Sequence, residues 1–291
     1  MTVREICERL DFPVEATSCI LEMMALLSTR CDVPALFAPI VEKFLRADKA
    51  FLDELQRMAE EYGVNRYTLD MLFLLCAVPD LRQAYAERGI AEHILWDSMK
   101  DLRYKLMECY DNHGVWGTFV TFWYPGFYCC ERFALGRLQY EKKRFSHPVY
   151  GDLLKEGDTV LNCHIPSSGP LTPVTVLDSL KRAYAFYPDV RIGDLMPVVC
   201  HSWLLYPPHR DLLGENAKAF YDLFDVIEEK VSESNGNFWR IFNMPYSAEN
   251  LACAREDTSL RRRFKAFLTA GNKMGDGYGV LLFDGERVVK R

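Results

Sequence analysis

Two Cys-His dipeptides, Cys163-His164 and Cys200-His201, each lie near the end of an apolar segment that is typical of a buried strand. Imidazole titrates near neutral pH, so a histidine at a strand end suits a general base or a metal ligand. Neighbouring strands would let the two imidazoles face one another, but adjacent Cys and His side chains point to opposite faces of a sheet. We therefore predict His164 and His201 as catalytic residues and no metal site, with hydrogen-bonded structural histidines as the alternative. A hydrolase that uses Ser202 or Cys163 as nucleophile is a third, less favoured interpretation.

The segment from Gly136 to Glu141 places three polar side chains on one face of a predicted strand. Arg137, Gln139 and Glu141 alternate with apolar residues, so all three share a face. Burying such a row is costly unless the groups pair with one another or bind a ligand. Glu141 is therefore a candidate general base, and Arg137 and Gln139 are candidate substrate contacts. A structural Arg137–Glu141 network is the alternative.

Two glycine-containing segments could hold a phosphate or another anion. Residues 167–172 (SSGPLT) join a predicted strand to a predicted helix, so backbone N–H groups at Ser168 and Gly169 could face an anion. A plain capped turn is the alternative. In residues 272–279 (NKMGDGYG), Lys273 accompanies Gly275 and Gly277, but this segment precedes a strand, and a glycine-rich hairpin entry is the alternative. The G-x-S-x-G, H-E-x-x-H, P-loop and Rossmann signatures are absent from the sequence.

Composition and charge exclude several classes of protein. The 291 residues are 49% hydrophobic and 26% charged, enough apolar material for a full core, so general disorder is excluded. The 35 Lys+Arg and 41 Asp+Glu give a net charge of −6. Residues 1–112 carry 13 Lys+Arg against 20 Asp+Glu. A protein that binds the phosphate backbone of a nucleic acid needs a basic face, so we expect no nucleic-acid partner.

The sequence also suggests a compartment. The longest apolar run, Met71–Val78, is far shorter than the roughly 20 residues that span a bilayer, and charged residues precede any apolar stretch at the N-terminus. The ten cysteines form no C-x-x-C pair and mostly lie in apolar segments, as buried free thiols do in a reducing compartment. We therefore expect a cytoplasmic protein without a membrane segment.

The elements that must position these residues change character along the chain. Residues 1–113 show helical periodicity over 36–45, 55–62, 69–76 and 95–110, with stops at Gly63, Pro79 and Gly114. Beyond them we expect strands over 135–145, 159–165, 197–205 and 237–242, helices from 173, over 217–231 and over 259–268, and a C-terminal hairpin. Residues 118–130 remain ambiguous between strand and helix. The prediction is an α+β or α/β fold: a helical domain (1–113) packed on a mixed-sheet domain (114–291).

Several sequence blocks are familiar as a set. FALGRLQYE (133–141), CHIP (163–166) with GPL (169–171), CHSWLL (200–205), FWRIF (238–242) and TSLR (258–261) occur in this order. Together they resemble a bacterial acyltransferase family with an N-terminal helical acyltransferase domain and a GNAT-like C-terminal domain, over nearly the whole chain.

The resemblance implies an acyl-CoA-dependent N-acyltransferase whose sheet is splayed so that pantetheine reaches a strand edge. Acyl-CoA would be the co-substrate and a small-molecule amine the acceptor, attacking the thioester directly. Glu141 or His164 would deprotonate the amine, His201 and Ser202 would be further catalytic residues, and Trp203 would contact substrate. A non-catalytic GNAT-derived ligand-binding or interaction scaffold is the alternative.

Overall fold

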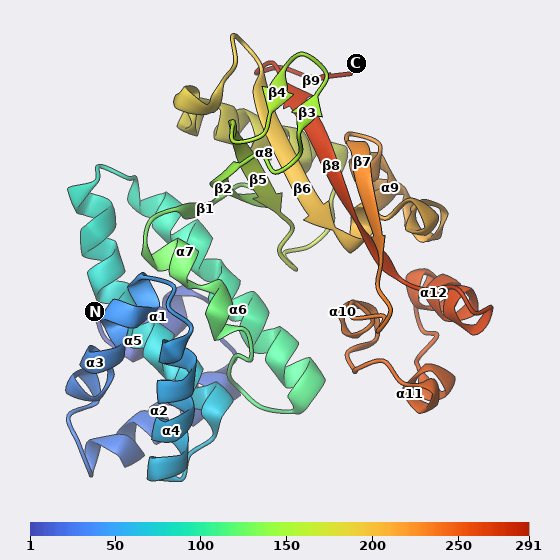
Figure 1. Ribbon diagram of the computed structural model, residues 1–291. Helices are drawn as coiled ribbons and strands as arrows, with labels where there is room; N and C mark the ends of the chain where they lie inside the picture. The colour runs from blue at the N-terminus through green and yellow to red at the C-terminus, as the bar shows by residue number, and fades with distance from the viewer. Residues whose placement is uncertain (291) are drawn as a thin grey trace. The chain divides into compact units, whose positions relative to one another are not determined.

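The computed structural model describes residues 1–290 and divides into two compact units, one of residues 1–133 and one that begins at Ala134 (Figure 1). This division lies further along the chain than the 113/114 boundary expected from the sequence. The ambiguous residues 118–130 belong to the helical unit, where they form two short helices, Thr121–Trp123 (η1) and Pro125–Tyr128 (α7).

The first unit is helical, as the sequence predicts. The helix α5 (Arg66–Glu87), which is as long as α6 (Glu92–His113), is buried on all sides from Thr68 to Leu75. Asn65 caps the start of α5, and Gly63 and Gly114 end α4 (Ala50–Tyr62) and α6 in the left-handed conformation that glycine tolerates. The main helices are α1 (Val3–Arg9), α2 (Val14–Ser28), α3 (Val33–Leu45), α4 (Ala50–Tyr62), α5 (Arg66–Glu87) and α6 (Glu92–His113).

Pro79 does not end its helix, contrary to the sequence expectation, and α5 continues to Glu87. A proline inside a helix removes one backbone hydrogen bond and costs about 3 kcal/mol. The residues around it, Val78, Leu81 and Tyr85, are almost fully buried. Burying three such side chains stabilises the continued helix by more than the proline costs.

No single helix among residues 1–290 has both the length and the apolar content needed to cross a membrane, although α2 and α3, bent by 103°, pass that test as a pair.

A buried carboxyl group lies at the centre of the helical unit. Asp70 on α5 is 3% exposed and accepts hydrogen bonds from Arg66, one turn earlier, and from the Thr121 hydroxyl. Burial raises the pKa of Asp70 to about 6, although the hydrogen bonds and the positive charge of Arg66 act in the opposite direction. The folded protein therefore holds this proton more tightly than the unfolded chain does.

This difference predicts how the stability of the protein depends on pH. The Asp70 contribution to the free energy of unfolding should be full below about pH 4 and lost as the pH rises through about 6. We expect the difference in unfolding free energy between the wild type and Asp70→Asn to fall by up to about 3 kcal/mol over this range, at 1.36 kcal/mol per pKa unit. Urea unfolding of both proteins at several pH values measures this difference in free energy. A difference that stays flat or increases with pH would contradict the assignment.

The second unit is built on a mixed sheet. Its strands follow the order β1-β2-β5-β6-β8-β7, with β9 paired to β8. β5 and β6 are parallel and joined by α8, whereas the β2–β5, β6–β8 and β7–β8 pairs are antiparallel. The strands are β1 (Arg132–Leu135), β2 (Leu138–Arg144), β3 (Val149–Tyr150), β4 (Leu154–Lys155), β5 (Thr159–His164), β6 (Met196–Ser202), β7 (Asp225–Val231), β8 (Gly275–Phe283) and β9 (Val288–Val289).

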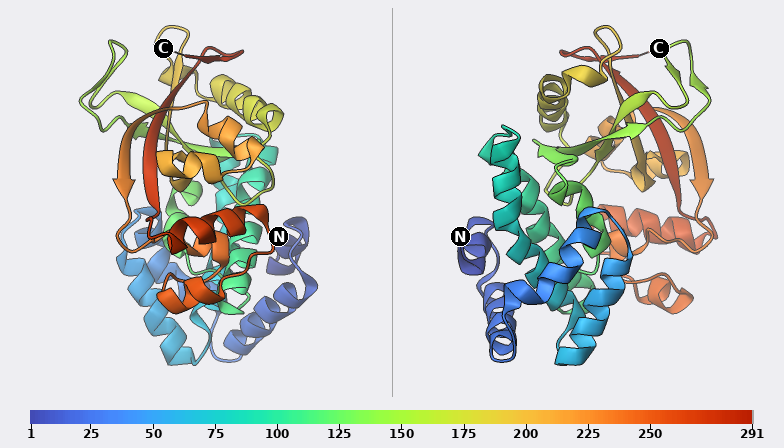
Figure 2. Two further views of the ribbon diagram at one scale, coloured as in Figure 1. Left: turned by 90° about the vertical axis from the view of Figure 1, so that its right-hand side faces the viewer. Right: turned by 60° about the vertical axis from the view of Figure 1, so that its left-hand side comes forward.

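Short helices connect these strands. They are α8 (Pro173–Phe186), η2 (Pro188–Val190), η3 (Trp203–Leu205), η4 (Pro207–Leu212), α9 (Glu215–Tyr221), α10 (Trp239–Phe242), α11 (Ala248–Cys253) and α12 (Ser259–Thr269). The helix α8 and the β3–β4 hairpin lie on opposite faces of the sheet (Figure 2). An apolar cluster of Phe145, Leu154, Val160, Val199, Val280 and Leu282 fills the hairpin side.

Two predicted elements of this unit are wrong. Residues 217–231 are not one helix, because the chain leaves α9 at Tyr221 and enters β7 at Asp225, where β8 offers a strand partner. Residues 237–242 are not a strand but contain α10. Their buried residues Phe238, Ile241 and Phe242 have the i, i+3, i+4 spacing of a helix.

Candidate functional site

The structure brings Glu141 and His164 together on the hairpin side of the sheet. The β2–β5 register places Gln139 opposite His164 and Glu141 opposite Asn162, so these side chains share one face. The His164 Nε2 and Glu141 Oε1 atoms are 3.0 Å apart, and the Asn162 amide donates to the same oxygen at 3.0 Å. The side chains of Glu141 and His164 are 10% and 19% exposed, so this acid–histidine pair is nearly closed to water.

Asn162 and Lys143 were missed by the sequence analysis. Lys143 Nζ lies 3.1 Å from the same Glu141 oxygen. Strand alternation could have indicated both residues. Lys143 lies two residues after Glu141, and Asn162 lies two residues before His164, so each shares a face of the sheet with its predicted neighbour. What the sequence does not show is the register that brings β2 and β5 together.

The pair lies where β5 and β6 separate. The β5–β6 ladder ends at Leu161↔Val198 and Asn162↔Val199. Each strand remains paired on its outer side, β5 with β2 through His164 and β6 with β8 through Ser202. The facing backbone edges of β5 and β6 beyond Asn162 and Val199 therefore lie outside their common ladder.

His201 lies on the same face of the sheet as His164, on the other side of this separation. It is two residues beyond Val199, which belongs to the hairpin-side apolar cluster, so alternation directs its side chain to that face. It is exposed, and its ring centroid is 6.5 Å from that of Tyr278 on β8. His164 and His201 thus lie on the same face of the sheet, on the two strands that separate here.

The two thiols of the Cys-His dipeptides point away from this face. Cys163 and Cys200 are each 1% exposed. A hydrogen bond with Cys200, together with burial, raises the pKa of Cys163 well above its usual range. The Ser202 hydroxyl accepts the backbone N–H of Leu204 at 3.2 Å and so caps η3. A raised pKa disfavours the thiolate form of Cys163, which is the form that acts as a nucleophile. The structure gives Ser202 a role in capping η3.

The β5–α8 turn, which carries Ser168 and Gly169, follows His164 directly. Arg137 shapes it by donating to the carbonyl oxygens of Gly169 at 2.7 Å and Pro170 at 3.2 Å. Gly169 has a φ of +108°, a conformation that favours glycine. Arg137 thus binds the turn itself, and Glu141 pairs with His164 and Lys143.

The second glycine-containing segment has a packing function in the structure. Lys273 forms an ion pair with Glu233. Gly277 lies within β8, and a Cβ placed on it would come within 2.0 Å of the Leu205 carbonyl oxygen. A Cβ on Gly275 would come within 2.6 Å of the Lys230 carbonyl oxygen. Close approach of neighbouring backbone accounts for both glycines without a bound phosphate.

Trp203 packs inward at the start of η3. Its ring centroid lies 5.7 Å from that of Phe264 on α12 and 6.1 Å from that of His209. The His209 Nδ1 atom is 2.8 Å from the Trp203 carbonyl oxygen. These contacts anchor the segment that follows His201 and Ser202. In residues 1–290 no group of three or more His, Cys, Asp or Glu side chains is placed to hold a metal ion.

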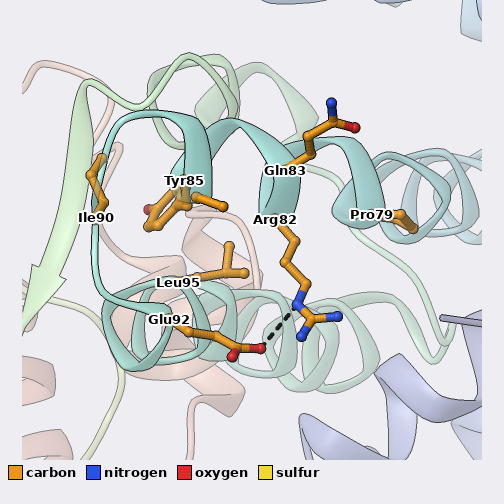
Figure 3. Close-up of a pocket in the computed structure, with 8 residues that line it drawn as sticks. Pro79, Arg82, Gln83, Tyr85, Ile90, Glu92 and Leu95 are labelled. Carbon is orange, nitrogen blue, oxygen red and sulfur yellow. Dashed lines mark hydrogen bonds and ion pairs between the residues drawn. The ribbon is translucent and has the colours of Figure 1, made fainter.

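The helical unit contains a pocket of 380 Å³ between α5 and the start of α6 (Figure 3). Tyr85, Ile90 and Leu95 supply apolar lining, and Arg82 Nε donates to Glu92 Oε1 at 3.0 Å (Figure 3). The two charged lining residues neutralise one another. The acid–histidine pair of the sheet is therefore a better candidate for catalysis than the residues that line this pocket.

Comparison with known families assigns both parts of the chain. A family model described as a GNAT-like C-terminal domain matches residues 133–281, and one described as an N-acyltransferase N-terminal domain matches residues 1–130. The chain belongs to this GNAT-like acyltransferase family. The two matched ranges meet close to the division between the compact units, and the expected two-domain acyltransferase organisation is confirmed.

Solved acyltransferase structures share the fold. An acyltransferase mutant in complex with octanoyl-CoA aligns with a TM-score of 0.72 and 21% identity, over 96% of this chain and 86% of that chain. An acyltransferase in complex with decanoyl-CoA and teicoplanin gives the same values, and one with CoA and 10C-teicoplanin differs only in its 20% identity. The α+β fold is therefore that of these acyltransferases. No curated protein matches the chain.

Proposed function

We propose that this GNAT-like family member is an N-acyltransferase that transfers an acyl group from acyl-CoA to a small-molecule amine. The observation that carries the proposal is the buried Glu141–His164 pair at the separation of β5 and β6. The acyl-CoA complexes of structural neighbours support a thioester donor, and the teicoplanin complex supports a small-molecule acceptor.

The separation of the strands suits the donor. Backbone groups on the facing edges of β5 and β6 would hydrogen-bond the pantetheine amides, as the sequence resemblance implies. The turn through Ser168 and Gly169, followed by the N-terminus of α8, would hold the phosphates, because backbone N–H groups and the helix dipole favour anions there. Lys273, Gly275 and Gly277 have no part in this proposal.

The chemistry is direct attack. The amine nitrogen bonds to the thioester carbonyl carbon, the C–S bond breaks, and CoA leaves as a thiolate. His164 takes the proton from the amine, while Glu141 stays ionised and stabilises the imidazolium that forms. Backbone N–H groups beside the gap would stabilise the developing oxyanion. His201, across the separation, would return a proton to the leaving sulfur.

Acyl-CoA binding tests the donor directly. Titration of the purified protein with CoA, octanoyl-CoA and decanoyl-CoA should give a saturable rise in Tm that depends on the acyl chain. A ligand at 100 times its Kd stabilises the folded state by about 2.7 kcal/mol, which a thermal melt resolves. Free octanoate and decanoate are the controls and should give smaller shifts.

The outcomes separate the two functions considered. No shift at millimolar acyl-CoA would contradict the proposal. A shift together with release of the CoA thiol on addition of an amine supports catalysis. A shift without release for any amine would favour the non-catalytic ligand-binding scaffold.

A further inference from the structure

Three side-chain nitrogen atoms converge on one oxygen of the buried carboxylate. Asn162 Nδ2 and His164 Nε2 each lie 3.0 Å from Glu141 Oε1, and Lys143 Nζ lies 3.1 Å from it. Asn162 Nδ2 is also 3.0 Å from His164 Nε2, so the four side chains form one cluster. The Glu141 side chain is 10% exposed, whereas that of Lys143 is 55% exposed. A cation at the surface therefore contacts a carboxylate that the sheet buries.

We propose that Lys143 sets the pH at which His164 can act as a base. The inference rests on the proposed function, in which His164 accepts the proton of the amine. A buried carboxylate next to an imidazole favours the protonated ring, and burial strengthens that attraction. A base that already carries its proton cannot accept another, so an unopposed Glu141 would inhibit catalysis near neutral pH. The charge of Lys143 offsets part of this attraction.

Other charged and titratable groups lie near this cluster. Arg137 donates to the carbonyl oxygens of the β5–α8 turn, and the His147 Nε2 and Glu228 Oε2 atoms are 2.6 Å apart. His201 on β6 and Tyr278 on β8 lie on the same face of the sheet as the cluster. The Lys143 ammonium group contacts the Glu141 carboxylate directly.

The chain supplies a matched control at the preceding residue. Lys142 carries the same charge, but strand alternation directs it to the opposite face of β2, where it pairs with Asp189. Its side chain is 44% exposed, close to the 55% of Lys143. Lys142→Met and Lys143→Met therefore change the net charge equally, and only the second removes a contact with Glu141.

The test is the titration of His164, followed by NMR in the full-length protein with isotope-labelled histidine. The chain has six histidines, and the signal that disappears in His164→Gln identifies the residue. We expect Lys143→Met to move the titration midpoint of His164 to higher pH by about 0.5–1 unit, a moderate shift because Lys143 is half exposed. Lys143→Arg should retain the wild-type midpoint, and Lys142→Met should change it by less than about 0.2 unit.

Enzyme kinetics supply the second measurement. The acidic limb of the plot of kcat/KM against pH should move to higher pH in Lys143→Met, by the same amount as the midpoint measured by NMR. An unchanged or lowered midpoint, or equal shifts in Lys142→Met and Lys143→Met, would overturn the inference. The NMR titration needs no acyl transfer, so failure of this inference is distinguishable from failure of the proposed function.

Discussion

Replacing Glu141 by Gln, or His164 by Ala, should lower the rate of acyl transfer by about 10²–10⁴-fold, the usual contribution of a positioned general base. The Gln side chain has nearly the shape of Glu but no charge, so it cannot stabilise an imidazolium 3.0 Å away. His164→Ala removes the proton acceptor itself. Both effects should fall on kcat, because neither residue is proposed to hold the donor.

The two substitutions should also be non-additive. Glu141 acts through His164, so the double variant should be no slower than the slower single variant. Acyl-CoA binding by thermal shift should remain in all three proteins and shows that the fold is intact. Glu156→Gln is a suitable control, because Glu156 is an exposed glutamate of the same unit. Full activity in either single variant would exclude the assigned base.

Gly277→Ala should strongly destabilise the sheet unit. The added Cβ would lie 2.0 Å from the Leu205 carbonyl oxygen, closer than any non-bonded contact, so the backbone of η3 or β8 must move. Overpacking of this kind costs about 3 kcal/mol. A domain of this size should then lose on the order of 10 °C in Tm.

The same measurements include a control variant and test the competing interpretation of residues 272–279 as a phosphate site. Gly236 lies outside the left-handed region, and an added Cβ there would come no closer than 3.6 Å to its neighbours, so Gly236→Ala should leave Tm within about 1 °C. Under the interpretation of residues 272–279 as a phosphate cradle, Gly277→Ala would weaken acyl-CoA binding without changing Tm. That outcome would contradict the packing explanation.

Local sequence patterns predicted much of the fold. Spacing of i, i+3, i+4 with a glycine stop located α4 and α6, and apolar runs located β5 and β6. The alternation of side chains also placed Cys163 and His164 on opposite faces. These features depend on residues close together in the chain, where backbone geometry alone fixes which side chains meet.

Prediction failed where a distant segment decided the structure. Residues 225–231 continue a helical pattern from α9 but form a strand because β8 pairs with them. Pro79 remains inside α5 because the helices around it bury its neighbours. Helix and strand propensities are weak compared with tertiary packing, so such segments follow their partners.

The sequence by itself determined the helical and mixed-sheet domains, the strand-end position of His164 and His201, and the candidacy of Glu141. Only the tertiary structure decided that Glu141 meets His164, Asn162 and Lys143. The reason is register: β2 and β5 are joined by a long connection, and sliding one strand by a single residue would turn Glu141 to the opposite face. The same structure showed that Gly275 and Gly277 make room for backbone, because a close approach between distant segments leaves no local pattern in the sequence.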